Sequence, residues 1–247
     1  MNVELTELTR KFGRTRAVAG VSLETGPGVL GLLGPNGAGK TSLLRMMATV
    51  LPPTSGTLSL LGRDPGAYGP RREIRRRLGY LPQNLGYYPG FTVVDFVEYF
   101  ALLKDMPPNQ VPRAVAAAIE HVGLGDRARA KLRTLSGGML RRAGIAQAIV
   151  NEPELLLLDE PTAGLDPEQR VSFRGLLREF GQRSTVIVST HLVEDVAAAC
   201  TEVMLMDAGR IVFHGTPDEL IARGEGHGVG DAPLERGYSA VLAAARS

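Results

Sequence analysis

The residues best suited to chemistry begin with a glycine-rich segment, residues 34–41, which fits the pattern G-x-x-x-x-G-K-[ST]. Such a loop can bind phosphate, because glycines let backbone N–H groups turn toward phosphate oxygens without a Cβ in the way. Lys40 would place a positive charge on the terminal phosphates, and the Thr41 hydroxyl is a hard oxygen suited to Mg²⁺. The predicted nucleotide-binding loop comprises Gly34, Pro35, Asn36, Gly37, Ala38, Gly39, Lys40, Thr41 and Ser42.

A second candidate is a pair of carboxylates, Asp159 and Glu160, which directly follow four leucines at 155–158. The leucines predict a strand inside a sheet, and ligands bind at the carboxyl ends of such strands. Taken alone, the pair could be two charges in an exposed turn. Together with a phosphate loop it predicts a metal-and-base site, in which Asp159 holds Mg²⁺ through water and Glu160 orients or deprotonates the attacking water.

A third candidate is the segment Ser136, Gly137 and Gly138, ahead of a predicted helix over 140–150. Ser136 alone could be an ordinary helix N-cap. Two glycines in a first helical turn cost about 1 kcal/mol each, which is easier to explain if a phosphate must approach the backbone. The segment lies 96 residues after Lys40, so we expect that it does not reach the nucleotide that Lys40 holds.

Hydrophobic periodicity predicts the elements that position these motifs. We expect an edge strand at 3–5, strands at 18–23, 29–33 and 57–61, and a helix over 40–50. The middle of the chain predicts helices over 93–103, 111–122 and 140–150. Strand and helix then alternate again: strands at 155–158, 185–189, 203–206 and 211–214, and helices over 192–200 and 234–245. Asp166 with Gln169, and Thr216 with Glu219, predict capping boxes at the start of two more helices.

This alternation indicates an α/β core in two pieces, residues 1–83 and 151–223, with a helical insertion over about 84–150 between them. A short tail follows at 224–247 and begins with a spacer at 224–230. One cysteine in 247 residues excludes an internal disulfide framework, and a net charge of +2 shows no strong field for nucleic acid. The arginines at 71, 72, 75, 76 and 77, and the pair Arg141 and Arg142, are predicted to be solvated. We find no membrane segment and no secretory signal, so we expect a cytoplasmic protein.

The chain resembles the ATP-binding subunit of ABC transporters over nearly its whole length, because of the motifs it contains and the order in which they occur. The resemblance is carried by the phosphate loop, Gln83, Leu-Ser-Gly-Gly at 135–138, Asp159 with Glu160, Gly-Leu-Asp at 164–166, and His191. It implies a P-loop NTPase core of the α/β class with a mainly parallel sheet, an N-terminal antiparallel β subdomain and an inserted α-helical subdomain. It also implies ATPase activity with ATP and Mg²⁺ as cofactors.

The resemblance further implies roles for single residues. Phe12 looks like the aromatic that stacks on adenine, and Gln83 like the residue that senses Mg²⁺ and water and links to a membrane partner. His191 looks like the γ-phosphate contact. Ser136, Gly137 and Gly138 would bind the ATP of a second copy, and Asp166 would cross that interface. Met139 departs from the family, which usually has Gln there.

The implied partners are separate transmembrane permease subunits and a second ATPase subunit, identical or different, at the cytoplasmic face of the membrane. Tyr-Leu-Pro-Gln at 80–83 and the aromatic residues at 87–91 look like the exporter branch. One alternative is a soluble ABC ATPase acting on DNA or ribosomes, but the chain has neither a long coiled-coil insertion nor two cassettes. Another is a GTPase or small-molecule kinase, but the guanine-reading Asn-Lys-x-Asp is absent.

Overall fold

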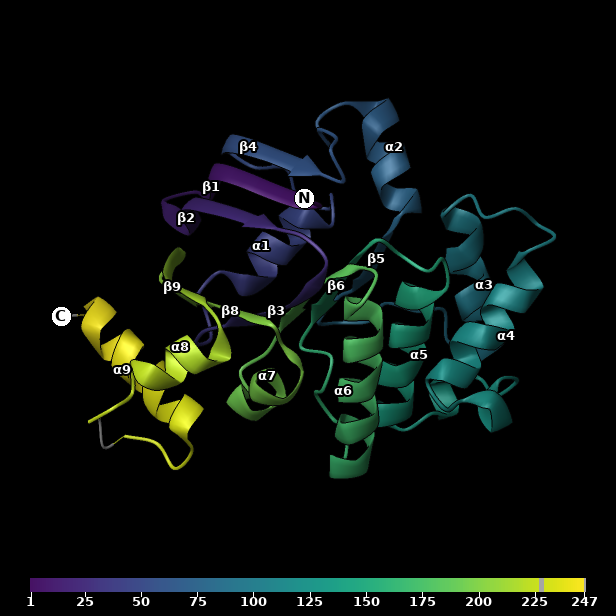
Figure 1. The fold of residues 1–247 in the computed structure, drawn as a ribbon. Coiled ribbons are helices and arrows are strands. Elements are labelled where there is room, and N and C mark those ends of the chain that lie inside the picture. Colours follow the sequence, from purple (N-terminus) through teal and green to yellow (C-terminus); the bar gives the residue numbers. More distant parts are fainter. Residues whose placement is uncertain (227–228, 247) are drawn as a thin grey trace.

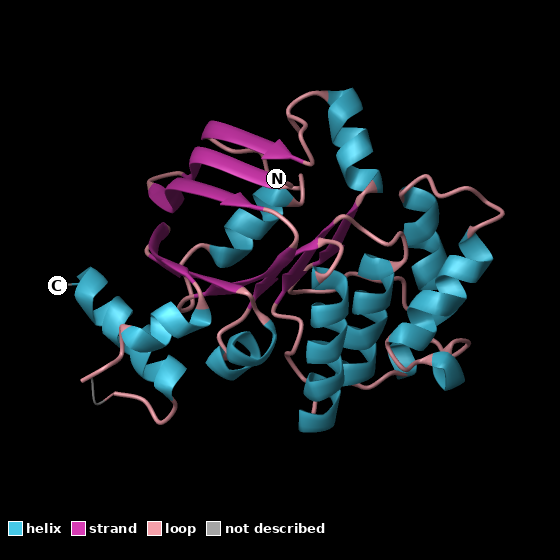
Figure 2. Cartoon of the chain, in the orientation of Figure 1, coloured by secondary structure: helices cyan, strands magenta, loops and turns pink. Residues whose placement is uncertain are grey.

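Buried apolar strands form a six-stranded sheet at the centre of the computed structural model, which describes residues 1–226 and 229–246 (Figures 1 and 2). The strands run parallel except for the last, which is antiparallel to its neighbour. Their order is β5 (Leu78–Leu81), β6 (Leu155–Asp159), β7 (Thr185–Ser189), β3 (Gly28–Leu33), β8 (Glu202–Asp207) and β9 (Arg210–Gly215). Every residue of β6 and β7 is buried, as expected for strands covered on both faces.

A smaller antiparallel sheet lies above the first, in the order β2 (Thr15–Thr25), β1 (Val3–Phe12) and β4 (Ser55–Leu60) (Figure 1). The edge position predicted for the first strand is wrong, because β1 pairs on both sides. Alternation of apolar and polar residues decides which face of a strand is buried, not where the strand lies in the sheet. Helix α1 (Lys40–Met47) is enclosed between the two sheets, with Leu43, Leu44, Met46 and Met47 fully buried.

Three helices lie between β5 and β6 in the chain and pack to one side of the core: α3 (Val93–Leu103), α4 (Val111–His121) and α5 (Gly137–Ile149) (Figure 1). Thr92 and Asp95 form a capping box that begins α3. Helix α5 begins three residues earlier than predicted, because the Ser136 hydroxyl accepts a hydrogen bond from the amide of Met139. Two 3-10 turns, Gly125–Arg127 and Leu132–Thr134, connect α4 to α5.

The remaining helices follow the strands of the second half of the chain: α6 (Pro167–Gly181), α7 (Val193–Ala199), α8 (Pro217–Ala222) and α9 (Pro233–Arg246). Asp166 caps α6 by accepting from the Gln169 amide at 2.8 Å. The predicted capping box does not close there, because the Gln169 side-chain oxygen is buried without a partner. The box predicted at Thr216 is complete. Leu234 and Leu242 of α9 belong to a buried hydrophobic cluster that also contains residues of α7, α8 and β8.

Two elements have no counterpart in the prediction: α2 (Tyr68–Arg76) and the short strand β5. The first predicted helix ends at Met47 rather than Val50, and Thr49 adopts φ +59°. The predicted spacer at 224–230 includes residues 227 and 228, which lie outside the described residues. Among the helices described, none is long and apolar enough to cross a membrane.

Candidate functional site

The phosphate loop connects β3 to α1, and the chain packed against its inner side requires glycine at two of its positions. Gly39 has φ +102°, and a Cβ there would lie 2.1 Å from the carbonyl oxygen of Ala17. At Gly34 (φ +149°) a Cβ would lie 2.3 Å from the Met206 carbonyl oxygen. Gly39 is also the N-cap of α1 and supplies no side-chain cap, so the first amides of α1 remain available to an anion.

Lys40 is buried against its own loop. Its Nζ donates to the carbonyl of Gly34 at 2.5 Å and to the carbonyl of Pro35 at 3.2 Å. Burial lowers the pKa of Lys40, and the nearby charges of Glu160 and Asp159 oppose that shift. The two carboxylates therefore favour the charged form of the lysine, which is the form that attracts phosphate.

A cavity of about 480 Å³ brings several predicted residues together. Phe12 comes from the end of β1, Gln83 from the segment after β5 and Glu160 from the segment after β6. The Phe12 side chain is not in the core: the residue is 48% exposed, with the Arg10 guanidinium 4.6 Å from the ring centroid. The cavity lining comprises Phe12, Ala17, Asn36, Gly37, Ala38, Gly39, Lys40, Thr41, Ser42, Gln83 and Glu160.

Asp159 is fully buried at the end of β6, next to the phosphate loop. Its Oδ1 accepts from the Ser189 hydroxyl at 2.5 Å and from the Thr41 hydroxyl at 3.3 Å. Its Oδ2 is buried with no hydrogen-bond partner. A carboxylate oxygen without a partner beside a hydroxyl is a donor set that suits Mg²⁺. Among the described residues, no cluster of three or more His, Cys, Asp or Glu could bind a metal.

Glu160 adopts an unusual backbone conformation, with φ +49°. Its amide donates to both the carbonyl and the hydroxyl of Ser189, each at 3.1 Å. Its Oε2 lies 2.8 Å from Nδ1 of His191, whose side chain is 58% exposed. Glu160 is therefore held at its backbone and its carboxylate by residues at the end of β7 and just after it. Ser189 was not among the predicted site residues, although a polar residue that ends a buried strand beside β6 could have indicated it.

Arg141 is not solvated, and that prediction is wrong. The residue is 7% exposed, and its guanidinium donates to four backbone carbonyls at the ends of β5 and β6. Burial lowers its pKa to about 10, while Asp159 and Glu160 act in the opposite direction. Charge pattern along a helix could not have predicted this, because every acceptor is distant in sequence.

The remaining predicted residues form a second group, outside the cavity that contains Lys40. Ser136, Gly137 and Asp166 are exposed at the N-termini of α5 and α6. Gly138 packs closely against the segment that leads into α6: a Cβ at this position would lie 3.0 Å from the carbonyl oxygen of Gly164. One chain thus presents two separate groups of candidate residues, one around the phosphate loop and one at these helix ends.

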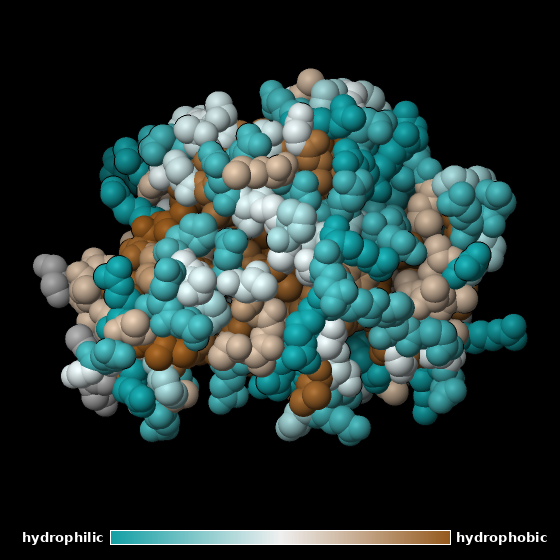
Figure 3. Space-filling model, in the orientation of Figure 1, coloured by the Kyte–Doolittle hydropathy of each residue, from teal (hydrophilic) through white to brown (hydrophobic). Residues whose placement is uncertain are grey.

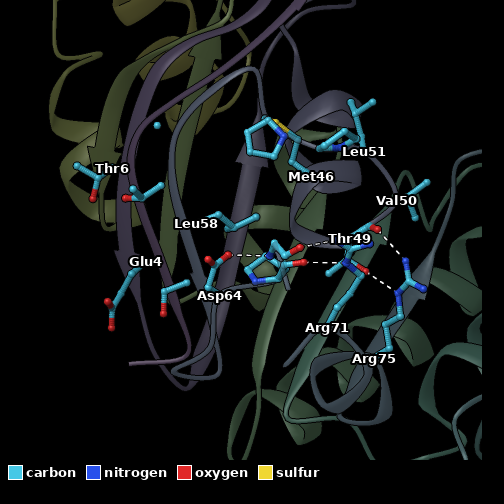
Figure 4. Close-up of a pocket in the computed structure, with 17 residues that line it drawn as sticks. Glu4, Thr6, Met46, Thr49, Val50, Leu51, Leu58, Asp64, Arg71 and Arg75 are labelled. Carbon is cyan, nitrogen blue, oxygen red and sulfur yellow. Dashed lines mark hydrogen bonds between the residues drawn. The ribbon is translucent and has the colours of Figure 1, made fainter. Parts of the chain in front are cut away.

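A larger cavity of about 800 Å³ lies between β4 and α2 and contains neither group (Figure 4). Its arginines already have partners, since Arg71 donates to the carbonyls of Pro65 and Gly66 and Arg75 donates to Thr49 (Figure 4). The rest of the predicted solvated cluster is also paired: Arg72 and Arg76 with Asp105, and Arg77 with Glu154. The larger cavity therefore lacks the groups that the predicted chemistry requires.

Comparisons with known proteins agree with this geometry. A family model described as ABC transporter matches residues 18–163. Nod factor export ATP-binding protein I of Cupriavidus metallidurans is 37% identical over 221 residues, 89% of this chain and 72% of the relative. The linearmycin resistance ATP-binding protein LnrL of Bacillus subtilis is 31% identical over 223 residues, 90% of this chain and 71% of the relative.

Two solved structures share the fold. The ATP-binding subunit of an ABC transporter superposes with a TM-score of 0.86 at 22% identity and covers 98% of this chain and 100% of its own. cbiO1 from Clostridium perfringens, described as part of the ABC transporter complex cbiONQ, gives 0.77 at 28% identity, covering 89% of this chain and 90% of its own. The chain therefore belongs to the ABC transporter family, as an ATP-binding subunit that hydrolyses ATP.

Proposed function

We propose that ATP binds in the cavity around the phosphate loop. Adenine stacks on Phe12, the amides of residues 34–42 bind phosphate oxygens, and Lys40 turns from its own loop carbonyls to the terminal phosphates. Thr41, Asp159 and Gln83 hold Mg²⁺, which when bound supplies positive charge against the phosphate oxygens. The observation that carries this assignment is the common location of Lys40, Asp159 and Glu160, with the Asp159 Oδ2 atom buried and without a partner.

Glu160 is the proposed base in hydrolysis. It lines the same cavity as Lys40, so its carboxylate can accept a hydrogen bond or a proton from a water aligned with the γ-phosphate. His191 holds the carboxylate at Oε2 and contacts the γ-phosphate through its other ring nitrogen. Catalysis in this arrangement comes mainly from positioning and charge, because phosphoryl transfer needs little covalent participation by the protein.

The second group of residues completes the site of another copy. Ser136, Gly137 and Gly138 bind the ATP held by the phosphate loop of a partner, and Asp166 crosses the same interface. A two-fold head-to-tail pair, of identical or related subunits, then encloses two ATP molecules. ATP binding favours the closed pair, and hydrolysis removes that preference. The exposure of Ser136, Gly137 and Asp166, and the absence of these residues and of Gly138 from the Lys40 cavity, support this arrangement.

This cycle drives transport, in the direction of export, through separate transmembrane subunits at the cytoplasmic face of the membrane. Relatives named for Nod factor export and linearmycin resistance support that direction.

Hydrophilic residues cover much of the face in Figure 3. The exposed apolar residues Tyr88, Tyr99, Leu102 and Leu103 offer a docking surface for a membrane subunit. Tyr88 is 61% exposed, and its ring centroid lies 6.4 Å from that of Tyr99.

In this scheme residues 84–150 form the helical subdomain that carries both that surface and Ser136, while 1–83 and 151–223 form the core and 224–247 a tail.

Purification of the tagged chain from membranes of its source tests the transport assignment. An integral membrane protein should copurify with the wild type. A Tyr88→Ser, Leu102→Ser variant should lose it, whereas Tyr68→Ser, which alters an exposed tyrosine on α2, should retain it. Recovery of only soluble partners would contradict the assignment.

A further inference from the structure

Arg141 connects the helical insertion to both strand ends of the candidate site. It lies in the second turn of α5, whose N-cap is Ser136. Its Nη1 donates to the carbonyl of Pro82 at 2.8 Å and to that of Gln83 at 3.1 Å. Its Nη2 donates to the Asp159 carbonyl, and its Nε lies 3.4 Å from the Pro161 carbonyl. One guanidinium thus joins the segment after β5 to the segment after β6.

Two of the carbonyls that Arg141 binds, those of Asp159 and Pro161, lie on either side of Glu160. A non-glycine residue at φ +49° is uncommon and strained, so it persists only where its surroundings impose it. Ser189 holds this backbone from the amide side. Arg141 holds it from the carbonyl side, through the residues before and after Glu160. The two together fix the direction in which the Glu160 side chain leaves the backbone.

Only an arginine can make this set of contacts. A guanidinium has five N–H donors in a rigid planar fork, whereas a lysine ammonium is a compact charge on a flexible stem. The carboxylates of Asp159 and Glu160 lie near enough to favour the charged guanidinium. Helix α5 has a separate connection to β5, because the Gln147 side chain donates to the Tyr80 carbonyl at 2.8 Å. We therefore expect the insertion to stay attached to the core when Arg141 is replaced.

We propose that Arg141 is a positioning residue for hydrolysis, which sets the backbone around Glu160 and Gln83 and ties it to the helix that begins at Ser136. This rests on the proposed roles of Glu160 and Ser136. Arg141 touches no substrate and acts only through the carbonyls it binds. Its loss should therefore slow hydrolysis and leave ATP binding by the phosphate loop intact.

The test compares Arg141→Lys and Arg141→Gln with the matched variants Arg142→Lys and Arg142→Gln. Arg142 is the neighbouring residue on α5, and its guanidinium binds the carbonyls of Val122 and Gly123 within the insertion itself. We expect kcat to fall at least tenfold in both Arg141 variants, while the Kd for ATP, measured by titration, changes less than threefold. The Arg142 variants should retain kcat within about twofold. Thermal melting of all four variants monitors folding.

A second measurement separates positioning from structural support. In the Glu160→Gln background, which cannot report on hydrolysis, Arg141→Lys should leave the ATP-dependent dimer intact on size-exclusion chromatography. Loss of that dimer, equal kcat in the Arg141 and Arg142 variants, or a kcat that falls only in proportion to the melting temperature would overturn the proposal. A wild type that hydrolyses ATP without any dimer would instead contradict the proposed function, and would show itself before any Arg141 variant is made.

Discussion

Nδ1 of His191 lies 2.8 Å from Oε2 of Glu160, so a half-exposed imidazole contacts a buried carboxylate across the ends of neighbouring strands. The backbone of Glu160 is already fixed by Ser189. The histidine therefore restricts the remaining freedom of the side chain. We therefore expect Glu160 and His191 to act as one unit, so that replacing either affects the same step of the reaction.

Glu160→Gln should lower the rate of ATP hydrolysis by about 10³-fold, because an amide cannot accept a proton from water. The phosphate loop is untouched, so ATP affinity should change little. Phosphate release measures the rate, and nucleotide titration measures the affinity. Glu24→Gln, a carboxylate exposed on β2, is the matched control and should hydrolyse ATP like the wild type. Turnover by Glu160→Gln at the wild-type rate would exclude Glu160 as the base.

His191→Ala should lower kcat by about 10²-fold, because the Glu160 carboxylate loses the group that orients it. Residues that act as a unit are not additive, so the double variant Glu160→Gln, His191→Ala should be no slower than Glu160→Gln alone. Steady-state kinetics on the four proteins of this cycle measures the coupling. His121→Ala alters a surface histidine paired with Glu179 and should leave kcat unchanged. Additive losses would show that His191 acts independently of Glu160.

Lys40→Ala should weaken ATP binding by about 10- to 100-fold, the loss expected for one charge-assisted contact to phosphate. Removal of a buried cation beside Asp159 and Glu160 leaves those carboxylates without their nearest positive neighbour on the loop. Calorimetric titration with ATP measures the affinity, and Lys131→Ala, at an exposed position, serves as control. An unchanged Kd in the Lys40 variant would remove the phosphate-loop assignment.

The sequence predicted the parts of the site that depend on local pattern. The phosphate loop, Asp159 and the N-caps Ser136 and Asp166 follow from motifs within a few residues, and the structure places them at the expected strand and helix ends. It did not predict β5, since four residues with a glycine among them resemble a loop until β6 pairs with them. Nor did it predict α2, whose four arginines and one glutamate within 71–76 obscure an apolar face that consists of Ile74 alone.

The misplacement of Arg141 has a different physical reason. Its acceptors Pro82 and Asp159 are 59 and 18 residues away, so no local rule connects them to a helix in the insertion. A charged residue on a helix is usually solvated, and only the meeting of two strand ends supplies enough carbonyl oxygens to bury it. For the same reason, the sequence does not show that Ser189 neighbours Asp159 and Glu160, because the pairing of β6 with β7 brings these residues together.

The burial of Lys104 predicts that the free energy of unfolding depends on pH in the alkaline range. Burial lowers its pKa to about 8 in the folded chain, and its ammonium donates to the Leu78 carbonyl of β5. Between pH 8 and about pH 10.5 the unfolded chain therefore binds more protons at this residue, so its contribution to the free energy of unfolding rises with pH. Relative to Lys104→Met, the wild type should gain on the order of 1 kcal/mol across this window.

Urea unfolding of both proteins at about pH 7.5 and about pH 9.5 measures this difference. Lys131→Met, at an exposed position, is the control for the loss of a lysine elsewhere in the insertion. If the difference between wild type and Lys104→Met stays constant over this range, the ammonium of Lys104 is not desolvated in the folded protein.

The claim that one ATP is shared by two chains is tested most directly by the mass of the Glu160→Gln protein with saturating ATP, measured by light scattering. A shared site requires twice the mass of a single chain with ATP and a single-chain mass without it. In the same background Ser136→Asp should remain a single chain that still binds ATP, whereas Ser136→Asn should pair. Both residues cap α5 well, and only the aspartate repels phosphate. A single-chain mass for Glu160→Gln fully loaded with ATP, or a dimer that Ser136→Asp leaves intact, would show that the two chains do not share ATP.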